Sequence, residues 1–296
     1  MLVTCHPHHE AIAWFPRVRG HYLAKHLARA GLAAEFHELP VPGVRPTVVI
    51  CSEYQQELDW LEQHLAAPLT ALGAERTYCL ADASLVDAPD HFSQPYCRWF
   101  AARGGVLCHL AGEDLLPYEH WIGIGVDGEV VRPDANGRRD QVVFDHPKRG
   151  TPPDPGALAT IRARIPGLRL VGTGPDDTPD QDAYDEWIDY GLPHETYVRA
   201  VFAGAVAYVP GAHESMGLPI TEAQVAGACV VSSIFQVKPE LLVPSAKVGY
   251  EAGDADSLVV ALAVAQARDG VEIREQALER FDFAAVAART RAAIGL

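Results

Sequence analysis

Short runs of β-branched and apolar residues alternate with runs of helical hydrophobic spacing along this 296-residue chain, and this alternation restricts its fold more than any other feature. Strands separated by helices at this spacing predict βαβ units in a mainly parallel sheet. The strand-like runs of the second half are 141–145, 168–172, 205–211 and 228–233. The helix-like runs that follow them are 156–167, 193–204, 218–227 and 254–267. We therefore expect an α/β fold.

The first half shows the same alternation. It predicts a helix over 21–31 and buried strands over 46–52 and 104–112. Residues 56–73 also have helical spacing, which Pro68 is expected to kink or split. Proline has this effect because it lacks a backbone N–H and its ring clashes with the preceding turn.

The alternation stops at the segment GVDGEVVRPDANGRRD, which is rich in Gly, Asp, Arg and Pro and ends at Asp140. Such a composition is typical of a linker between domains. We predict a compact N-terminal Rossmann-like domain over 1–126 and a second one over 127–280. A C-terminal helix over 281–296 is expected to pack back on the first domain.

Composition and charge exclude some classes of protein. With 48% hydrophobic and 21% charged residues, the chain can bury sizeable cores and is not of a disordered type. The net charge of −15 argues against a surface that coats nucleic acid, because phosphate binding needs a basic face. Six cysteines lack CxxC spacing, so we expect reduced thiols. No run approaches the roughly 18 to 20 apolar residues of a membrane span, so we expect no transmembrane segment and a cytoplasmic location.

The segment HESMGLPITEAQVAGACVVSS, residues 213–233, places Glu214 and Glu222 eight positions apart around a Gly-Leu-Pro turn. The 18 residues between the flanking strands suffice for a parallel crossover through a short helix. The loop therefore follows the carboxyl end of a strand and opens onto a helix N-terminus, where α/β sheets bind ligands and anions. Gly217 lets the backbone approach a ligand closely. Two carboxylates around an anion-binding helix end suit a ligand with hydroxyls at both ends and a diphosphate between them, such as a nucleotide sugar.

Simpler interpretations stay open. A glutamate in the first helical turn stabilises the helix dipole without any ligand, and a loop glutamate is usually solvated. The stretch from Arg132 to Arg169 holds eight Lys or Arg against four acidic residues. It is either a positive site for an anionic small molecule or a solvated basic face.

The same segment resembles the E-x7-E signature of retaining glycosyltransferases of the GT-B fold, especially family 4. Other segments fit in the same order: IGIGVDGEVVRPD resembles the family's linker, LRLVGTGPD its strand and G-x-G-P turn, VGYEAGDADSLVVAL a late helical segment, and RGHYLAKHLARAG an early glycine and helix. The resemblance implies two Rossmann-like domains whose parallel sheets face a central cleft.

The resemblance also implies roles for single residues. Glu214 would contact the hydroxyls of the donor sugar, and Glu222 would bind the ribose of the nucleotide. Lys148 and Arg149 would bind the diphosphate and, with Glu214, would be the catalytic residues. The backbone that would hold sugar and diphosphate is that of Ser215, Met216, Gly217 and Leu218. The chain departs from the family pattern where VVFDHPKRG stands in place of a glycine-arginine pair at the strand end with a later lysine.

Gly20 and His109 are further candidates for donor binding. Gly20 precedes a predicted helix and His109 follows a predicted strand, and each can equally be an ordinary turn or core-edge residue. The cluster CHPHH at 5–9 lacks a second pair of metal ligands. No DxD-type motif stands in a suitable place, so we expect no metal and no cofactor. The acidic stretch 176–189 is interpreted as a solvated loop.

The resemblance, together with these features, implies a metal-independent, retaining glycosyltransferase that takes a nucleotide sugar as its donor. The first half normally binds the acceptor in this family, and here it is short. A small-molecule, glycan or lipid-linked acceptor is favoured over nucleic acid because the chain is acidic. Two alternatives stay open: a nucleotide-sugar epimerase or hydrolase of the same fold, and a degenerate GT-B protein that only binds.

Overall fold

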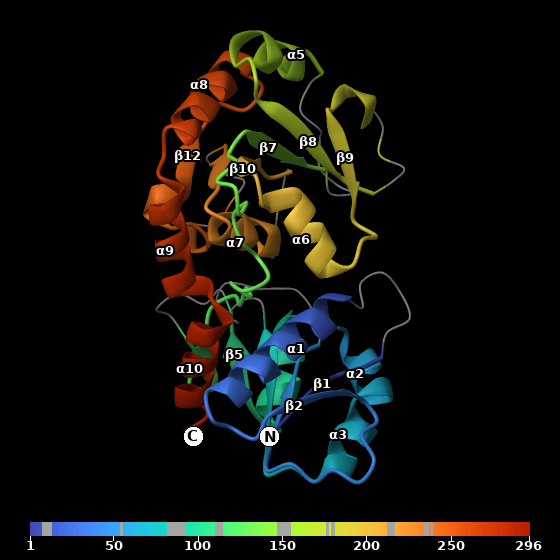
Figure 1. Cartoon of the computed structure of the whole chain (residues 1–296). Coiled ribbons are helices and arrows are strands. Elements are labelled where there is room, and N and C mark those ends of the chain that lie inside the picture. Colours follow the sequence, from blue (N-terminus) through green and yellow to red (C-terminus); the bar gives the residue numbers. More distant parts are fainter. Residues whose placement is uncertain are drawn as a thin grey trace. The chain divides into compact units, whose positions relative to one another are not determined.

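The computed structural model describes residues 1–7, 14–53, 56–81, 93–109, 115–146, 155–175, 178, 181–211, 217–233, 237 and 239–296 (Figure 1). The chain divides into two compact units. Unit 1 comprises Met1–Gly125 with Phe283–Leu296, and unit 2 comprises Val126–Asp282. The boundaries expected from the sequence alone are 126 and 280.

Among the described residues, unit 1 contains a six-stranded parallel sheet in the order β2-β1-β3-β4-β5-β6. Its strands are β1 (Leu2–Cys5), β2 (Glu35–Glu38), β3 (Val48–Cys51), β4 (Arg76–Ala81), β5 (Gly104–Cys108) and β6 (Glu119–Trp121). Its helices are α1 (Trp14–Arg29), α2 (Leu58–His64), α3 (Ala66–Leu72), α4 (Ser93–Ala101) and α10 (Phe283–Ala293). The strand order reverses between β1 and β3, because β2 and β3 lie on opposite sides of β1.

Helix α1 begins at Trp14 rather than at the predicted residue 21, so Gly20 lies inside the helix and not before it. A Cβ at Gly20 would come within 2.6 Å of the Phe36 ring on β2 and 3.1 Å of Cβ of Ser52. The missing side chain therefore allows α1 to pack closely on the sheet. This packing accounts for the glycine without a ligand.

The helical run at 56–73 forms two helices, α2 and α3, which meet at Leu65. In a continuous helix the Pro68 ring would clash with the carbonyl group four residues earlier, at His64, and α2 ends at that residue. The predicted split is thus confirmed. Leu61, Leu65 and Leu69 remain in the hydrophobic core of unit 1.

Among its described residues, unit 2 contains a second six-stranded parallel sheet, in the order β12-β11-β10-β7-β8-β9. Its strands are β7 (Gln141–Asp145), β8 (Arg169–Gly174), β9 (Glu186–Asp189), β10 (Ala205–Val209), β11 (Cys229–Ser232) and β12 (Lys247–Gly249). Its α-helices are α5 (Pro155–Arg164), α6 (His194–Phe202), α7 (Leu218–Val225), α8 (Ala255–Gln266) and α9 (Gly270–Phe281), and its short 3-10 turns are η2 (Gln181–Ala183), η3 (Pro239–Leu241) and η4 (Pro244–Ala246). The strand order reverses between β7 and β10.

The interpretation of the stretch 176–189 as a solvated loop is wrong for residues 181–189, which contain η2 and the edge strand β9. Residues 176, 177, 179 and 180 lie outside the described residues. Two of its carboxylates have partners on the neighbouring strand β8: Glu186 lies 3.0 Å from Arg169, and Asp185 accepts a hydrogen bond from N–H of Leu170 at 2.7 Å. Partners on β8 thus offset the negative charge of these two residues. The interpretation as a loop was based on that charge.

The segment that follows Gly125 packs on unit 2. Val130 and Val131 are buried, and Arg274 of α9 donates hydrogen bonds to the carbonyl groups of Gly128 and Val131, both at 2.9 Å. The predicted linker is therefore an ordered part of unit 2 from Val126 onward.

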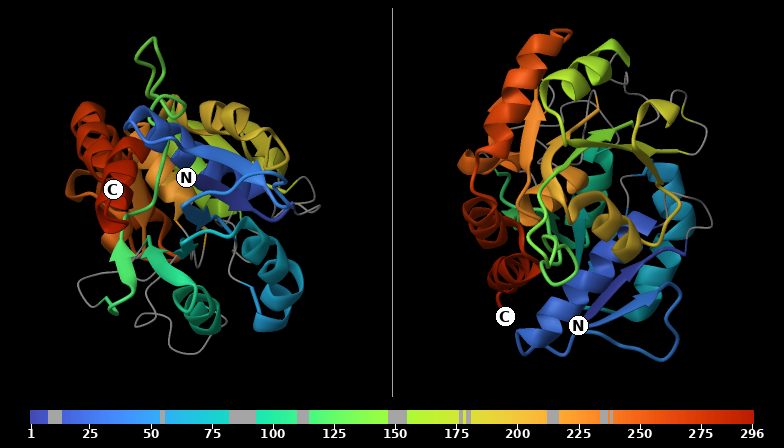
Figure 2. Two further views of the ribbon diagram at one scale, coloured as in Figure 1. Left: turned by 90° about the horizontal axis from the view of Figure 1, so that it is seen from below. Right: turned by 45° about the horizontal axis from the view of Figure 1, so that its top comes forward.

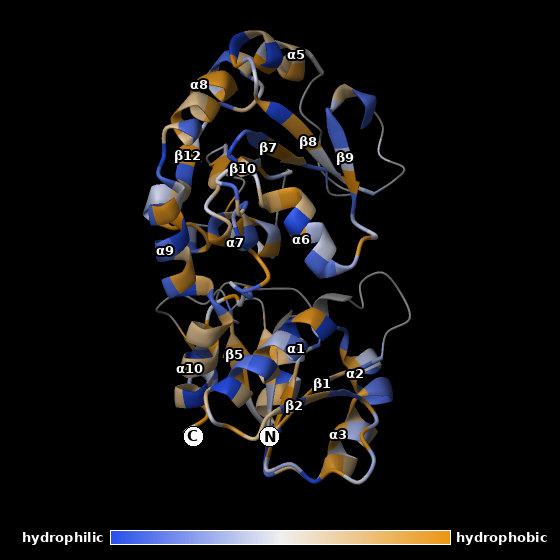
Figure 3. Cartoon of the chain, in the orientation of Figure 1, coloured by the Kyte–Doolittle hydropathy of each residue, from blue (hydrophilic) through white to orange (hydrophobic). Residues whose placement is uncertain are grey.

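At the other end of the chain, α10 belongs to unit 1 and packs beside α1, the red and blue helices near the two termini (Figures 1 and 2). Phe283 stacks on His26 with ring centroids 6.0 Å apart. Hydrophobic and polar residues occupy different sides of α9 (Figure 3), as in helices with one buried face. None of the described helices combines the length and the apolar character that crossing a membrane requires. All six cysteines are buried free thiols.

Candidate functional site

The candidate site lies at the carboxyl edge of the unit 2 sheet, where β7 and β10 are neighbours and the strand order reverses. Open α/β sheets bind ligands at this kind of position. Strand β7 ends there at Asp145 and β10 at Val209, while helices α6 and α7 begin at His194 and Leu218. These four element ends position the side chains of the site.

Helix α7 begins directly after Gly217, whose φ of +65° lies in the left-handed region. Glycine adopts this conformation at little cost. The close approach of a ligand to the backbone at Gly217 stays a prediction. In the structure, a Cβ at this position would also overlap Leu241. Pro219 stands in the first turn, where its missing N–H breaks no helical hydrogen bond. Gly217 is thus required by the turn and by Leu241 independently of any ligand.

Glu222 lies on the second turn of α7, is the only charged residue of that helix and is 2% exposed. Its Oε1 lies 2.7 Å from Nε2 of His194, the first residue of α6. A carboxylate only accepts hydrogen bonds, so this nitrogen carries the proton. Oε2 of Glu222 accepts no hydrogen bond from any residue in the described part of the chain.

Two opposing effects act on the pKa of His194. Burial lowers it, but the negative charges of Glu222, Glu195 and Asp127 together raise it, and the pKa of His194 lies above its ordinary value of 6.5. The imidazole is therefore charged over a wider pH range than a solvated histidine. This pair was not predictable from local sequence patterns, because the two residues are 28 positions apart.

A second buried carboxylate, Asp145, stands at the end of β7 and is 3% exposed. The hydroxyl of Tyr208 on β10 donates to its Oδ2 at 2.7 Å, and the hydroxyl of Tyr190, after β9, donates to its Oδ1. We did not single out Asp145 from the sequence, since its partners follow 45 and 63 positions later.

The two glycines of G-T-G-P make room for protein side chains. A Cβ on Gly172 would come within 2.5 Å of the Trp187 ring, and a Cβ on Gly174 within 3.1 Å of Cβ of His146. Nε2 of His146 lies 2.5 Å from the hydroxyl of Tyr184, and burial lowers the pKa of His146 to about 4. His146 is therefore neutral near pH 7, and the glycines serve the packing of this aromatic cluster.

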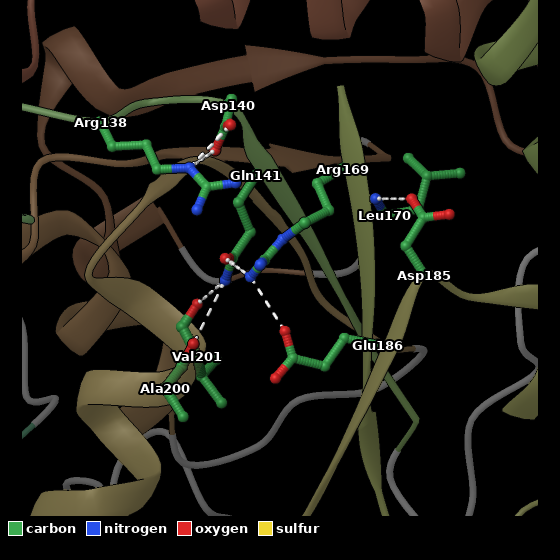
Figure 4. A network of polar contacts seen from close by, with 9 residues as sticks. All are labelled: Arg138, Asp140, Gln141, Arg169, Leu170, Asp185, Glu186, Ala200 and Val201. Atoms are coloured by element: carbon green, nitrogen blue, oxygen red, sulfur yellow. Dashed lines mark hydrogen bonds and ion pairs between the residues drawn. The ribbon is translucent and has the colours of Figure 1, made fainter. Parts of the chain in front are cut away.

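Most of the described arginines of the basic stretch 132–169 form hydrogen bonds or ion pairs at the amino edge of the sheet, opposite the candidate site (Figure 4). Arg138 pairs with Asp140 at 2.8 Å, and Arg169 donates to Gln141 at 2.7 Å besides its contact with Glu186. Their charge is offset by their own neighbours. The observed arrangement fits a solvated basic face and gives no support to an anion site at these arginines.

His109, which follows β5 in unit 1, is 4% exposed, and Nη1 of Arg19 lies 3.3 Å from its Nε2. Burial and the charge of Arg19 lower the pKa of His109 well below 6.5. A hydrogen bond to the backbone of Gly123 raises this pKa, but by less. Both ring nitrogens thus have partners within unit 1. Arg19 also donates to the carbonyl of Glu53 at 2.8 Å, so it ties the ends of β3 and β5 together. The predicted contact of His109 with the donor stays a prediction.

The predicted site residues Glu214, Ser215, Met216, Lys148 and Arg149 lie outside the described residues, and their roles stay predictions. Of the CHPHH cluster, Cys5 is a buried thiol, His6 lies edge-on to Trp60 at 5.2 Å, and His8 and His9 are outside the described residues. Within the described part of the chain there is no group of three or more His, Cys, Asp or Glu suited to a metal.

No family model and no curated protein matches this chain. Solved structures match it over nearly its whole length. The sucrose-phosphate synthase of Thermosynechococcus elongatus has a TM-score of 0.61 at 14% identity and covers 99% of this chain and 98% of its own. HepE of Anabaena, solved with UDP and glucose, has a TM-score of 0.61 at 12% identity and covers 99% of both chains. The lipopolysaccharide outer core galactosyltransferase WaaB has a TM-score of 0.56 at 12% identity, and the match covers 99% of this chain and 98% of the WaaB chain.

These likenesses concern the fold. The described residues of this chain form two parallel six-stranded sheets with flanking helices, and this fold matches those structures over nearly their whole length. The prediction of an α/β fold with two parallel sheets is confirmed. The chain has the two-domain architecture of the GT-B glycosyltransferases.

Proposed function

We propose that this chain is a glycosyltransferase that moves a sugar from a nucleotide-sugar donor to an acceptor. The proposal rests mainly on Glu222, a buried carboxylate at the point where the strand order reverses. Its Oε2 accepts no hydrogen bond from a protein donor in the described part of the chain. An acceptor-only oxygen in this position suits a ligand hydroxyl. The likeness to HepE, which has been solved with UDP and with UDP-glucose, supports a nucleotide sugar as the ligand.

In this proposal Glu222 binds the ribose, and Glu214 binds the hydroxyls of the donor sugar. The backbone of 215–218 and the N-terminus of α7 hold the diphosphate, since unpaired N–H groups and the positive helix end favour an anion. The E-x7-E resemblance supports these roles. It also supports assignment to family 4.

The proposed reaction proceeds with retention of anomeric configuration and without a metal. Retaining transfer passes through a cation-like sugar while the diphosphate departs, so the protein mainly stabilises the charge of the leaving group and positions the acceptor. Lys148 and Arg149, which follow Asp145 after β7, would stabilise that charge. The acceptor is proposed to be a small molecule, a glycan or a lipid-linked group.

A thermal-shift screen against UDP-, GDP- and ADP-sugars tests the proposal. A ligand present at 100 times its dissociation constant stabilises the folded chain by about 2.7 kcal/mol, which is readily visible as a rise in melting temperature. Product analysis of the sugar that binds, with and without candidate acceptors, then separates transfer from epimerisation or hydrolysis. The absence of any shift would contradict the proposal, and binding without turnover would favour the binding-protein alternative.

The double variant Lys148→Ala with Arg149→Ala tests the assignment of the diphosphate contacts. We expect turnover to fall strongly while the unfolding midpoint in urea stays close to that of the wild type. Normal turnover in this variant would reject the assignment.

A further inference from the structure

The contact between His194 and Glu222 joins two helices that both begin at the carboxyl edge of the unit 2 sheet. His194 is the first residue of α6, and its side chain is 11% exposed, against 3% for the side chain of Glu222. The 2.7 Å distance from Nε2 to Oε1 is that of a charge-assisted hydrogen bond. It fixes the direction in which the carboxylate points.

The packing of α7 does not require a charged pair at this position. Helix α7 is buried on nearly all sides, and an apolar residue at position 222 would fill the same space without any charge. Replacing a buried ion pair by apolar residues is often neutral or stabilising, so stability alone is a weak reason for the pair. The arrangement also leaves Oε2 without a protein donor among the described residues.

We propose that His194, as an imidazolium, is a positioning residue of the nucleotide site. This inference rests on the proposed function. Nε2 of His194 holds Oε1 of Glu222, which presents Oε2 to a ribose hydroxyl of the ligand. The positive charge of His194 also offsets the carboxylate charge of Glu222 next to a diphosphate ligand. His194 thus acts on the ligand through Glu222.

The charges around His194 give the proposal a pH dependence. Among the described residues, the carboxylates that act on it are Glu222 from α7, Glu195 from its own helix and Asp127 from the segment before β7. They outweigh burial, so the pKa of His194 is raised in the folded chain. The stabilisation from the pair is then complete below pH 6.5 and is lost as the pH rises through the raised pKa. Nucleotide affinity should follow the same direction.

The test is a set of calorimetric titrations with the ribonucleoside diphosphate, among UDP, GDP and ADP, that the wild-type chain binds most tightly. Its 2′,3′-dideoxy analogue serves as the second probe. Removing a hydrogen bond to a charged group changes affinity by roughly ten- to a hundredfold, and we expect the wild-type chain to discriminate between the probes to that extent. His194→Leu should lower ribonucleotide affinity at least about tenfold and remove most of the discrimination.

His194→Gln keeps a donor for Oε1 but carries no charge. It should preserve most of the discrimination, and the ratio of wild-type to His194→Gln affinity should fall as the pH rises from 6 to 9. This ratio cancels the titration of the nucleotide's own terminal phosphate, whose pKa is about 6. His37→Gln is the matched control, because His37 pairs with Glu35 in an exposed position, 3.2 Å apart. The control should leave affinity, discrimination and pH profile unchanged.

The outcomes separate the two proposals. If none of the three diphosphates binds the wild-type chain, the proposed function is contradicted, and the positioning role with it. If one binds but His194→Leu retains wild-type discrimination and loses only thermal stability, His194 is structural and the inference alone is overturned. A ratio of wild-type to His194→Gln affinity that stays constant from pH 6 to 9 overturns it as well.

Discussion

The charged side chains at the two edges of the unit 2 sheet differ in burial and in the partners that they have. At the amino edge, arginines pair with nearby carboxylates in the open: Arg162 and Asp185 lie 2.9 Å apart, and both side chains are 39% exposed. At the carboxyl edge, Asp145 and Glu222 are almost fully buried and are held by phenols and an imidazole. The amino edge offsets its charges with exposed ion pairs, whereas the carboxyl edge keeps two carboxylates out of water.

This difference indicates where function is to be sought. Exposed ion pairs contribute little to stability and are common on protein surfaces. A buried charge is costly unless it is paired and hydrogen-bonded, so a buried carboxylate with one oxygen left open calls for an explanation. A ligand at the carboxyl edge supplies one. Four substitutions test the comparison.

The largest effect is expected for Gly217→Ala. The variant places a non-glycine residue at a φ of +65° and an added methyl group against Leu241. We expect a loss of about 2 to 4 kcal/mol in the free energy of unfolding, measured in urea. The control is Gly253→Ala, which has a φ of +82° but nothing within 4 Å of an added Cβ. Equal losses in the two variants would show that the contact with Leu241 does not matter.

The next effect is that of Glu222→Gln on ligand affinity. The amide keeps the shape of the side chain but has only one acceptor oxygen, which cannot accept hydrogen bonds from both His194 and a ribose hydroxyl. Loss of such a bond to a charged group corresponds to roughly ten- to a hundredfold weaker binding of a nucleoside diphosphate in calorimetry. Unchanged affinity in a folded variant would remove Glu222 from the site.

A smaller effect is expected for Tyr208→Phe, which takes one donor from the buried Asp145 carboxylate. The free energy of unfolding should fall by about 1 to 3 kcal/mol, because a hydrogen bond to a buried charge is lost. Tyr190→Phe is the comparison: Tyr190 donates to the same carboxylate but is 38% exposed, so water can replace it. A larger loss for Tyr190→Phe than for Tyr208→Phe would contradict the account of Asp145.

The smallest effect is expected at the amino edge. Arg162→Ala removes an ion pair in which both side chains are well exposed. The free energy of unfolding should therefore change by less than about 1 kcal/mol, and nucleotide affinity should not change. Urea unfolding and calorimetry measure both quantities. A loss of affinity in this variant would mean that the two edges are not functionally distinct.

The fold was largely predictable from local patterns. The strands β7, β8, β10 and β11 are continuous apolar runs of the kind found in buried parallel strands, and Pro68 divides α2 from α3 by a local steric effect. Strand β9 was missed because its acidic residues acquire partners, such as Arg169, only once β8 lies beside it. Local composition does not show such pairing.

The candidate site was predictable only in part. Glu222 and Gly217 were identified from one contiguous segment and its spacing. The partners His194, Tyr208 and Leu241 lie in other segments, and their contacts arise from the order of the strands. The same limit applies to Gly20, whose packing against Phe36 depends on a neighbouring strand.

The most direct test of the central claim is a crystal structure of the chain with a bound nucleoside diphosphate. The account predicts the nucleotide at the carboxyl edge of the unit 2 sheet, with a ribose hydroxyl about 2.6 to 3.0 Å from Oε2 of Glu222 and with Oε1 still held by His194. A nucleotide bound at another position, with Oε2 of Glu222 touching no part of it, would contradict the account.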